Sequence, residues 1–159
     1  MKVTIATLAF LLASFVAQAE TITGRVVGVA DGDTITVIDA ANQQHKIRLS
    51  GIDAPEKYQP FGQASKQSLS DQVYDRQVAV ETAKTDRYGR VVGKVMVSGK
   101  DTNLEQIKRG LAWHYRKYEN EQPIDDRVTY RKAEDEARAA RRGLWSEANQ
   151  VPPWEWRKR

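Results

Sequence analysis

The sequence predicts an α+β protein, mainly β, in which three helices accompany a five-stranded Greek-key barrel of the OB type. Short segments of alternating apolar and polar residues, separated by turn residues, fill the first third of the chain and return in its middle. Three segments with helical periodicity are interspersed with them or follow them. Several short strands with few helices are typical of a small barrel. The chain has no cysteine, so packing must stabilise the fold without disulfides.

The five strands are predicted from alternation and from the turns between them, at residues 23–29, 34–38, 46–49, 78–81 and 90–97. The third strand places Ile47 and Leu49 on one face and Arg48 on the other. Polar turns at 39–44 and 85–89 separate neighbouring strands. The first three strands, with the turns between them, are typical of a meander, and all five suit a Greek-key barrel.

Three helices are predicted. The first begins after Pro60, and its apolar stripe contains Phe61, Ala64, Leu69 and Val73. The second begins at a capping box, Thr102 to Glu105, and ends at Gly110. The third spans about 126–142, with acidic residues at its start, arginines at its end and a following glycine, which complements the helix dipole.

The first 19 residues are typical of a secretory signal peptide. Lys2 is followed by a short apolar segment and by the small residues Ala17 and Ala19 of an A-x-A cleavage site. The alternative is an uncleaved membrane anchor, but the apolar segment is shorter than the roughly 20 residues that span a bilayer. We therefore expect export to the periplasm or the medium, with Glu20 as the first mature residue and no membrane attachment.

The mature chain divides into a domain at 20–148 and a tail at 149–159. The tail contains two prolines and two tryptophans and is not expected to form a regular helix. Without residues 1–19 the chain has 24 Lys and Arg against 21 Asp and Glu, and the basic residues concentrate at 84–94, 108–117 and 127–142. Such patches suit a polyanion, although solvated helix faces also carry them. We expect a monomer with no stable protein partner.

Composition excludes several catalytic plans. With no cysteine and only His45 and His114, thiol nucleophiles and the usual zinc sites are ruled out. Residues 89–94 resemble a phosphate-binding loop, but the spacing is one residue short and Val95 stands where Ser or Thr is required. An enzyme with this composition would use carboxylates and arginines.

The carboxylates lie in two loops. Asp31 and Asp33 are two residues apart, and Asp53 and Glu56 flank the stiff turn at Pro55. Three or four hard oxygen ligands from two loops suit a Ca²⁺ site that leaves room for water and substrate.

Two alternatives exist for the first loop. An EF-hand would need glycine at 36 and glutamate at 42, where this chain has Thr36 and Asn42. Plain Asx turns between strands would also explain both loops. Arg48 and Arg90 favour chemistry, because a guanidinium matches two phosphate oxygens at once and lysine does not.

Together these segments resemble the staphylococcal (micrococcal) nuclease family, the thermonucleases. The resemblance covers residues 22–145, and the matching segments are Asp31–Thr34, Ile47–Glu56, Thr85–Arg90, Arg109–Ala112 and Gly143–Trp145. The resemblance implies an OB barrel with three helices, dependence on Ca²⁺, and cleavage of DNA and RNA to 3′-phosphate ends.

The resemblance also implies roles for individual residues. Asp33 and Asp53 would bind calcium through their side chains and Ala54 through its carbonyl, while Asp31 and Glu56 would act through water. Arg48, Glu56 and Arg90 would be catalytic. Ala54 departs from the threonine often found there, a change that a backbone ligand should survive. The substrate-binding residues would be Lys84, Tyr88, Tyr115 and Tyr118, whereas Trp113 and Trp145 are expected to pack in the core.

Two other functions remain open at this point. A catalytically inactive OB module would only bind nucleic acid, but such modules usually lose the acidic ligands and the arginines, which are present here. A barrel that binds sugar or protein has no specific feature in its favour.

Overall fold

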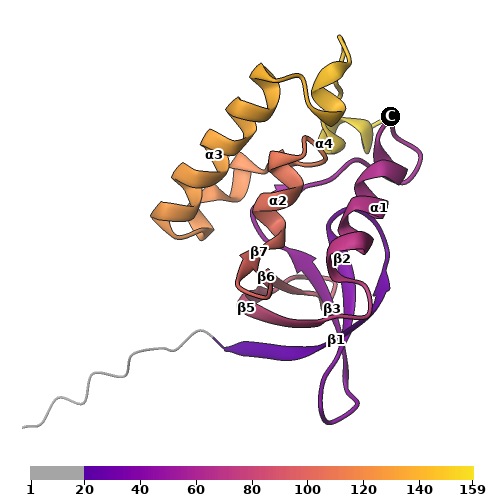
Figure 1. Cartoon of the computed structure of the whole chain (residues 1–159), viewed down its shortest axis with the longest axis vertical. Helices are drawn as coiled ribbons and strands as arrows, with labels where there is room; N and C mark the ends of the chain where they lie inside the picture. The colour runs from indigo at the N-terminus through magenta and orange to yellow at the C-terminus, as the bar shows by residue number, and fades with distance from the viewer. Residues whose placement is uncertain (1–19) are drawn as a thin grey trace, which may run out of the picture.

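The structure is a computed structural model that describes residues 20–159. The predicted signal peptide, residues 1–19, lies outside the described residues. A barrel forms one end of the molecule and the helices gather at the other (Figure 1). No helix within residues 20–159 is long and apolar enough to cross a membrane.

The barrel is the predicted one. Its five strands are β1 (Thr21–Val29), β2 (Thr34–Ile38), β3 (Gln44–Leu49), β5 (Gln77–Thr85) and β6 (Val91–Val97). They run in the order β3-β2-β1-β5-β6 with antiparallel neighbours, and a parallel pairing of β3 with β6 closes the barrel. Arg48 lies on this closing seam, because it pairs with Thr34 of β2 on one side and Val92 of β6 on the other.

Three two-residue strands were not predicted. β7 (Lys100–Asp101) pairs antiparallel with the end of β6, and β4 (Ile52–Asp53) pairs with β8 (Trp113–His114) in a separate two-stranded sheet. In that sheet Asp53 lies opposite Trp113. The loop with the second acidic pair is therefore braced by a segment 60 residues further along the chain.

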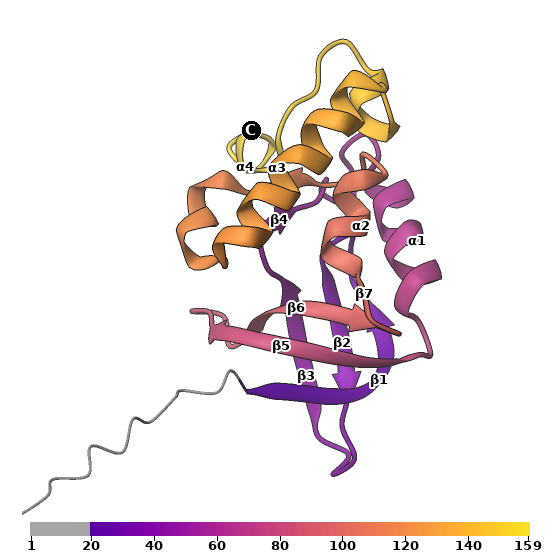
Figure 2. The ribbon, with the colours of Figure 1, turned by 60° about the vertical axis from the view of Figure 1, so that its left-hand side comes forward.

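The three predicted helices are α1 (Gly62–Val73), α2 (Thr102–Lys108) and α3 (Ile124–Ala139). They lie side by side beyond one end of the barrel (Figure 2). Short 3₁₀ helices cover Arg116–Glu121 and Gly143–Ser146. Gly110 and Gly143 have φ near +68° and +52°, so a residue with a side chain would be strained at either position.

Three local predictions were wrong. Asp101, not Thr102, caps α2: its carboxylate accepts from the Leu104 amide at 3.0 Å, while the Thr102 hydroxyl donates to the Val95 carbonyl. Ala64 is exposed, because the buried side of α1 carries serines instead. The tail forms a one-turn helix, α4 (Pro153–Trp156), since proline is well tolerated in a first turn.

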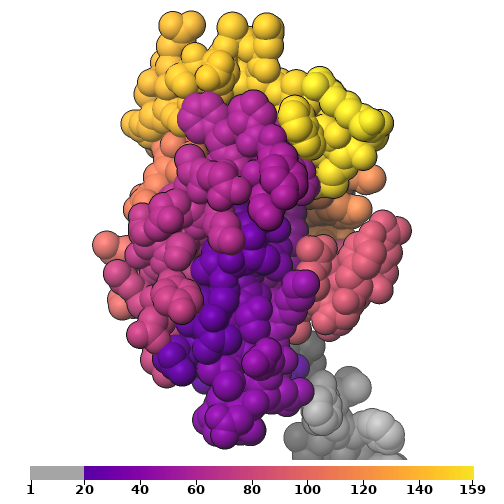
Figure 3. All heavy atoms as spheres, turned by 90° about the vertical axis from the view of Figure 1, so that its right-hand side faces the viewer, coloured from indigo at the N-terminus to yellow at the C-terminus, as the bar shows by residue number. Residues whose placement is uncertain are grey.

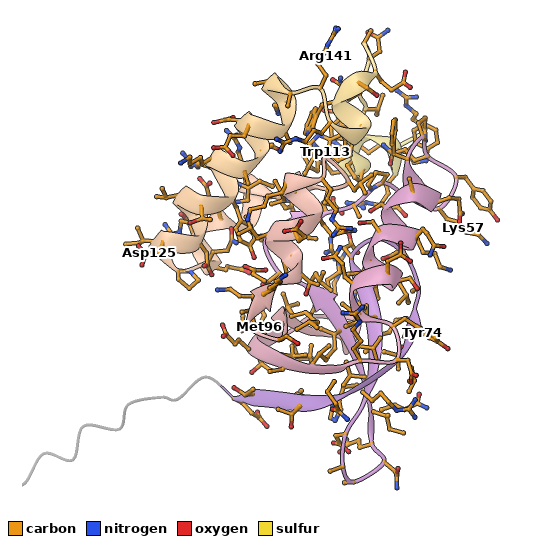
Figure 4. All side chains as sticks on the ribbon, in the orientation of Figure 1. Lys57, Tyr74, Met96, Trp113, Asp125 and Arg141 are labelled. Atoms are coloured by element: carbon orange, nitrogen blue, oxygen red, sulfur yellow. The ribbon has the colours of Figure 1, made fainter. Side chains whose placement is uncertain are left out.

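Two hydrophobic clusters stabilise the chain. The larger fills the barrel and reaches under α1, α2 and α3. The smaller contains Trp113, Ala137, Leu144 and Trp145, and Phe61 and Trp154 pack against it. Trp113 and Trp145 are each 5% exposed, which confirms their predicted place in the core. Figure 4 shows Trp113 inside the helical half, while Lys57 and Arg141 lie at its outer surface.

Candidate active site

A cleft of about 980 Å³ opens between the barrel and the helical half. Its walls come from both acidic loops, the β5–β6 hairpin, residues 115–123 and Arg157 of the tail. In Figure 3 the rose-coloured β5–β6 hairpin and the yellow C-terminal segment project on the same side, with a recess between them. Every residue predicted for metal binding, catalysis or substrate binding lines this cleft.

The first acidic loop is folded around its own carboxylates. The Asp33 amide donates to the Asp31 carboxylate at 3.0 Å, so the Asx turn of the alternative interpretation is present. Asp33 Oδ2 accepts from the Ala54 amide at 2.7 Å, which joins the two acidic loops. The first acidic loop therefore forms an Asx turn and also contacts the second acidic loop at the cleft.

Arg48 holds the two loops together. Its Nη1 donates to the carbonyls of Leu49 and Ile52 at 2.9 Å each. Its Nη2 contacts both Asp33, at 3.2 Å, and Asp53, at 3.0 Å. Two carboxylates thus converge on one nitrogen atom, and four of the five donors of this guanidinium are directed at protein groups.

The acidic loops carry four carboxylates, more negative charge than the arginines in contact with them neutralise. Burial, together with the negative charge of Asp33, raises the pKa of Asp31 to about 6. Burial also raises the pKa of Asp53, despite its contacts with Arg157 and Arg48. Buried carboxylates whose pKa values are raised in this way form a site that favours an added cation.

The donor set suits a hard divalent cation. Asp33 and Asp53 are 5% and 1% exposed and converge from two loops, and Asp31 lines the same cleft. Among the described residues, no three Asp, Glu or His side chains are close enough to enclose a metal by themselves. A cation here would thus depend on backbone oxygen and water for its remaining ligands.

Arg90 faces the same cleft from the hairpin. Its Nε donates to Asp86 at 2.8 Å, and the Asp86 side chain also accepts from the Arg90 amide at 3.0 Å. These hydrogen bonds overcome the effect of burial and lower the pKa of Asp86. Within residues 20–159 both terminal nitrogens of Arg90 have no hydrogen-bond partner, so four donors remain for a substrate.

The predicted substrate-binding residues lie on both sides of the cleft. Tyr88 is 68% exposed and lies against the guanidinium groups of Arg87 and Arg90. Lys84 contacts the Tyr118 ring at 5.3 Å and pairs with Glu121 at 2.7 Å. Across the cleft, Tyr115 stacks on Trp154 of the tail, with ring centroids 5.3 Å apart.

Sequence reasoning missed Arg157. Its guanidinium contacts Asp53 at 2.7 Å and Glu56 at 2.6 Å, so a second arginine, besides Arg48, contacts the acidic loops. These contacts with Asp53 and Glu56 raise the pKa of Arg157. Arg87, which also lines the cleft, was missed too. The only signals in the sequence were a basic run at the end of the tail and the basic character of the hairpin.

The barrel and the cleft define a small OB-type protein with a carboxylate–arginine site. Residues 46–147 match the family model described as staphylococcal nuclease homologue. A Haemophilus influenzae protein named uncharacterized endonuclease is 43% identical over 136 residues, which cover 86% of this chain and 73% of that protein. A Shigella flexneri protein named micrococcal nuclease is 40% identical over 144 residues, 85% of this chain and 80% of its own.

The chain therefore belongs to the staphylococcal nuclease family. A plant relative, the staphylococcal-like nuclease CAN1 of Arabidopsis thaliana, is 42% identical over 116 residues, but those residues are only 34% of its length. The predicted family and the OB-type barrel are both confirmed.

Proposed function

We propose that this nuclease is a calcium-dependent endonuclease that cleaves DNA and RNA without sequence specificity and leaves 3′-phosphate ends. The observation that supports the proposal most is the convergence of Asp33 and Asp53 on one nitrogen of Arg48. Carboxylates whose negative charge is not fully neutralised lie beside arginines at one cleft. A cation-binding site next to guanidinium groups is the arrangement that phosphodiester hydrolysis requires.

The proposed roles follow from these contacts. Asp33, Asp53 and the Ala54 carbonyl would hold Ca²⁺, with Asp31 and Glu56 acting through water. The bound cation supplies positive charge that polarises the scissile phosphate. Arg90 directs four donors at the cleft and would stabilise the negative charge that grows in the transition state.

Arg48 and Glu56 would act in different ways. Arg48 uses four donors on protein, so its main task is to hold both acidic loops, with its Nε left for a phosphate oxygen. The Glu56 side chain is 38% exposed in the cleft and would orient or deprotonate the attacking water. Sequence-independent binding fits the exposed Tyr88 and Tyr118, because every base can stack on a tyrosine.

An inactive binding module is the second candidate. It would share the basic cleft and the tyrosines but would not need buried, mutually repelling carboxylates. Such a charge arrangement costs stability, and it favours an enzyme with a cation over a surface that only binds nucleic acid.

The decisive experiment incubates residues 20–159 with supercoiled plasmid DNA and, separately, with RNA. We expect cleavage in Ca²⁺, little in Mg²⁺ because its strict octahedron suits an irregular site poorly, and none in excess chelator. End-group analysis should find 3′-phosphates. Full activity in chelator would disprove the metal assignment, and binding without cleavage in Ca²⁺ would favour the inactive module.

We also propose that the protein is exported and acts in the periplasm or outside the cell as a monomer. The basis for the proposed export is the leader-like sequence of residues 1–19. Exported protein should begin at Glu20 by mass spectrometry, and recovery with Met1 intact would contradict the cleavage.

A further inference from the structure

The C-terminal tail ends in the candidate active site. Arg157 reaches Asp53 and Glu56 from more than 100 residues further along the chain. Arg159, two residues on, lies over the Trp156 ring and contacts neither carboxylate. Of these two arginines of the basic tail, only Arg157 is placed to contact the carboxylates of the cleft.

The tail is fixed to the body of the protein before it reaches the cleft. The Gln59 side chain donates to the Val151 carbonyl, and Pro153 is buried. Trp154 stacks on Tyr115 and meets Trp113 edge-on, with ring centroids 6.4 Å apart. Aromatic contacts of this kind add stabilisation beyond that from the area that they bury. These contacts indicate that the tail is a permanent part of the cleft wall and not a cover that detaches.

Arg157 keeps donors free for a ligand. Its Nη1 and Nη2 contact the two carboxylates, and its side chain is 43% exposed at the cleft. Within the described residues, its Nε–H and one hydrogen of Nη2 have no protein acceptor. The guanidinium can therefore bind a phosphate while it stays on Asp53 and Glu56.

A phosphate that approaches these loops meets negative charge from Asp31, Asp33, Asp53 and Glu56. Arg48 spends four donors on protein and has little left for a ligand. A second guanidinium between Asp53, Glu56 and the substrate lowers this repulsion and offers donors to phosphate oxygens.

We propose that Arg157 is a phosphate-binding residue of the nuclease, which the tail anchored through Trp154 delivers to the cleft. The inference rests on the proposed function, since it takes nucleic acid as the ligand. It adds to that function a binding residue outside the barrel and assigns a role to the tail.

The test measures binding of a fluorescein-labelled, single-stranded DNA 12-mer by anisotropy, in chelator so that the DNA stays intact, between 50 and 300 mM NaCl. We expect Arg157→Ala to weaken binding about 5- to 20-fold at 100 mM salt. The slope of log affinity against log salt should fall by about 0.7, the value for one lost contact with a single-strand phosphate. Arg159→Ala removes the same charge from the same tail and should change affinity less than twofold.

A second variant tests delivery by the tail. Trp154 is only partly buried, so Trp154→Ala should leave the barrel folded, as checked by thermal denaturation. It should weaken DNA binding about as much as Arg157→Ala, and the double variant should lose no more than either single one. Arg157→Lys should recover only part of the affinity, because an ammonium lacks the planar fork.

The two proposals can fail separately. Wild-type protein that does not cleave DNA in Ca²⁺ contradicts the proposed function, whatever Arg157 does. If wild-type protein cleaves DNA, Arg157→Ala should mainly raise KM, as expected for uniform binding. Equal affinity and salt slope in Arg157→Ala and Arg159→Ala would overturn the inference. Tighter binding or faster turnover in Arg157→Ala would overturn it too, since the tail would then obstruct the cleft.

Discussion

Two buried polar regions of the molecule contrast sharply, the inner face of α2 and the acidic loops. On α2, Thr102, Asn103 and Gln106 are at most 3% exposed, and all three are neutral. Gln106 alone donates to the carbonyls of Gly32 and Ser65 and accepts from Ser68. In the acidic loops Asp31 and Asp53 are ionisable groups whose pKa values burial raises.

The difference shows that buried polar side chains can have opposite effects on stability. A neutral side chain with every hydrogen bond satisfied joins elements at little cost, whereas buried like charges reduce stability unless a ligand completes them. The two regions touch, since Gln106 holds Gly32 between Asp31 and Asp33. A rigid neutral support thus fixes a charged site that is unfavourable by itself.

The largest expected effect is a loss of activity at Arg90 with almost no loss of stability. Arg90→Ala should lower kcat/KM by about 10³–10⁵, mostly through kcat, because the lost donors act on the transition state. Stability should change by less than about 1 kcal/mol, since the pair with Asp86 is partly exposed. Steady-state kinetics and urea denaturation measure both. Arg25→Ala, which removes an exposed arginine paired with Asp75, should leave activity unchanged; near-wild-type turnover in Arg90→Ala would place the chemistry elsewhere.

The opposite result is expected at Asn103. Its side chain accepts from the Val95 amide and donates to the carbonyls of Ser50 and Gly93, and it is fully buried. Asn103→Ala leaves these groups unpaired and should cost about 2–4 kcal/mol of unfolding free energy. The exposed Asn120→Ala is the matched control and should stay within about 0.5 kcal/mol. Equal stability of the two variants would show that the polar face of α2 is not structural.

The smallest effect should be a gain, at Asp31. Its pKa is about 6 in the folded protein against 3.8 for the free side chain, so the folded state holds the proton more tightly. Ionisation therefore reduces stability as pH rises from about 4 to 6, and the full loss persists above that range. Asp31→Asn should stabilise the metal-free protein by about 1–3 kcal/mol at pH 7.5 and by little near pH 4. A loss of stability at pH 7.5 in urea denaturation would show that the charge is favourable there.

Much of the barrel could be predicted because its signals are local. Alternation in β2 and the turn after it lie within a few residues, and the interior positions of β3 follow from the same period of two. The carboxylates and the two arginines of the cleft could be singled out from residue type and position in or beside loops, whereas their individual roles and the substrate-binding residues came only from the resemblance to a family. Spacing alone shows that Asp31 and Asp33 share a loop, not that Asp53 and Asp33 both contact Arg48.

The failures have physical causes. The buried side of α1 carries Ser65 and Ser68, whose hydroxyls donate to the Leu111 carbonyl and to Gln106. A search for apolar periodicity does not detect buried serines, and it therefore placed Ala64 on the buried side wrongly. Arg157 has no periodic or motif signal, because its position depends on the packing of Trp154 against Tyr115. Contacts across 100 residues leave no trace in local composition.

The pairing of Asp53 with Trp113 has a consequence for the order in which the protein becomes functional during synthesis. All four carboxylates of the acidic loops lie before residue 57, and Arg90 follows within the next 34 residues. The strand that braces Asp53 comes later, and Trp113 is itself packed against Trp145. A nascent chain or proteolytic fragment that ends before Trp113 therefore carries all four carboxylates without the strand that braces Asp53. The acidic loops are thus fixed in place late, when the helical half of the protein is complete.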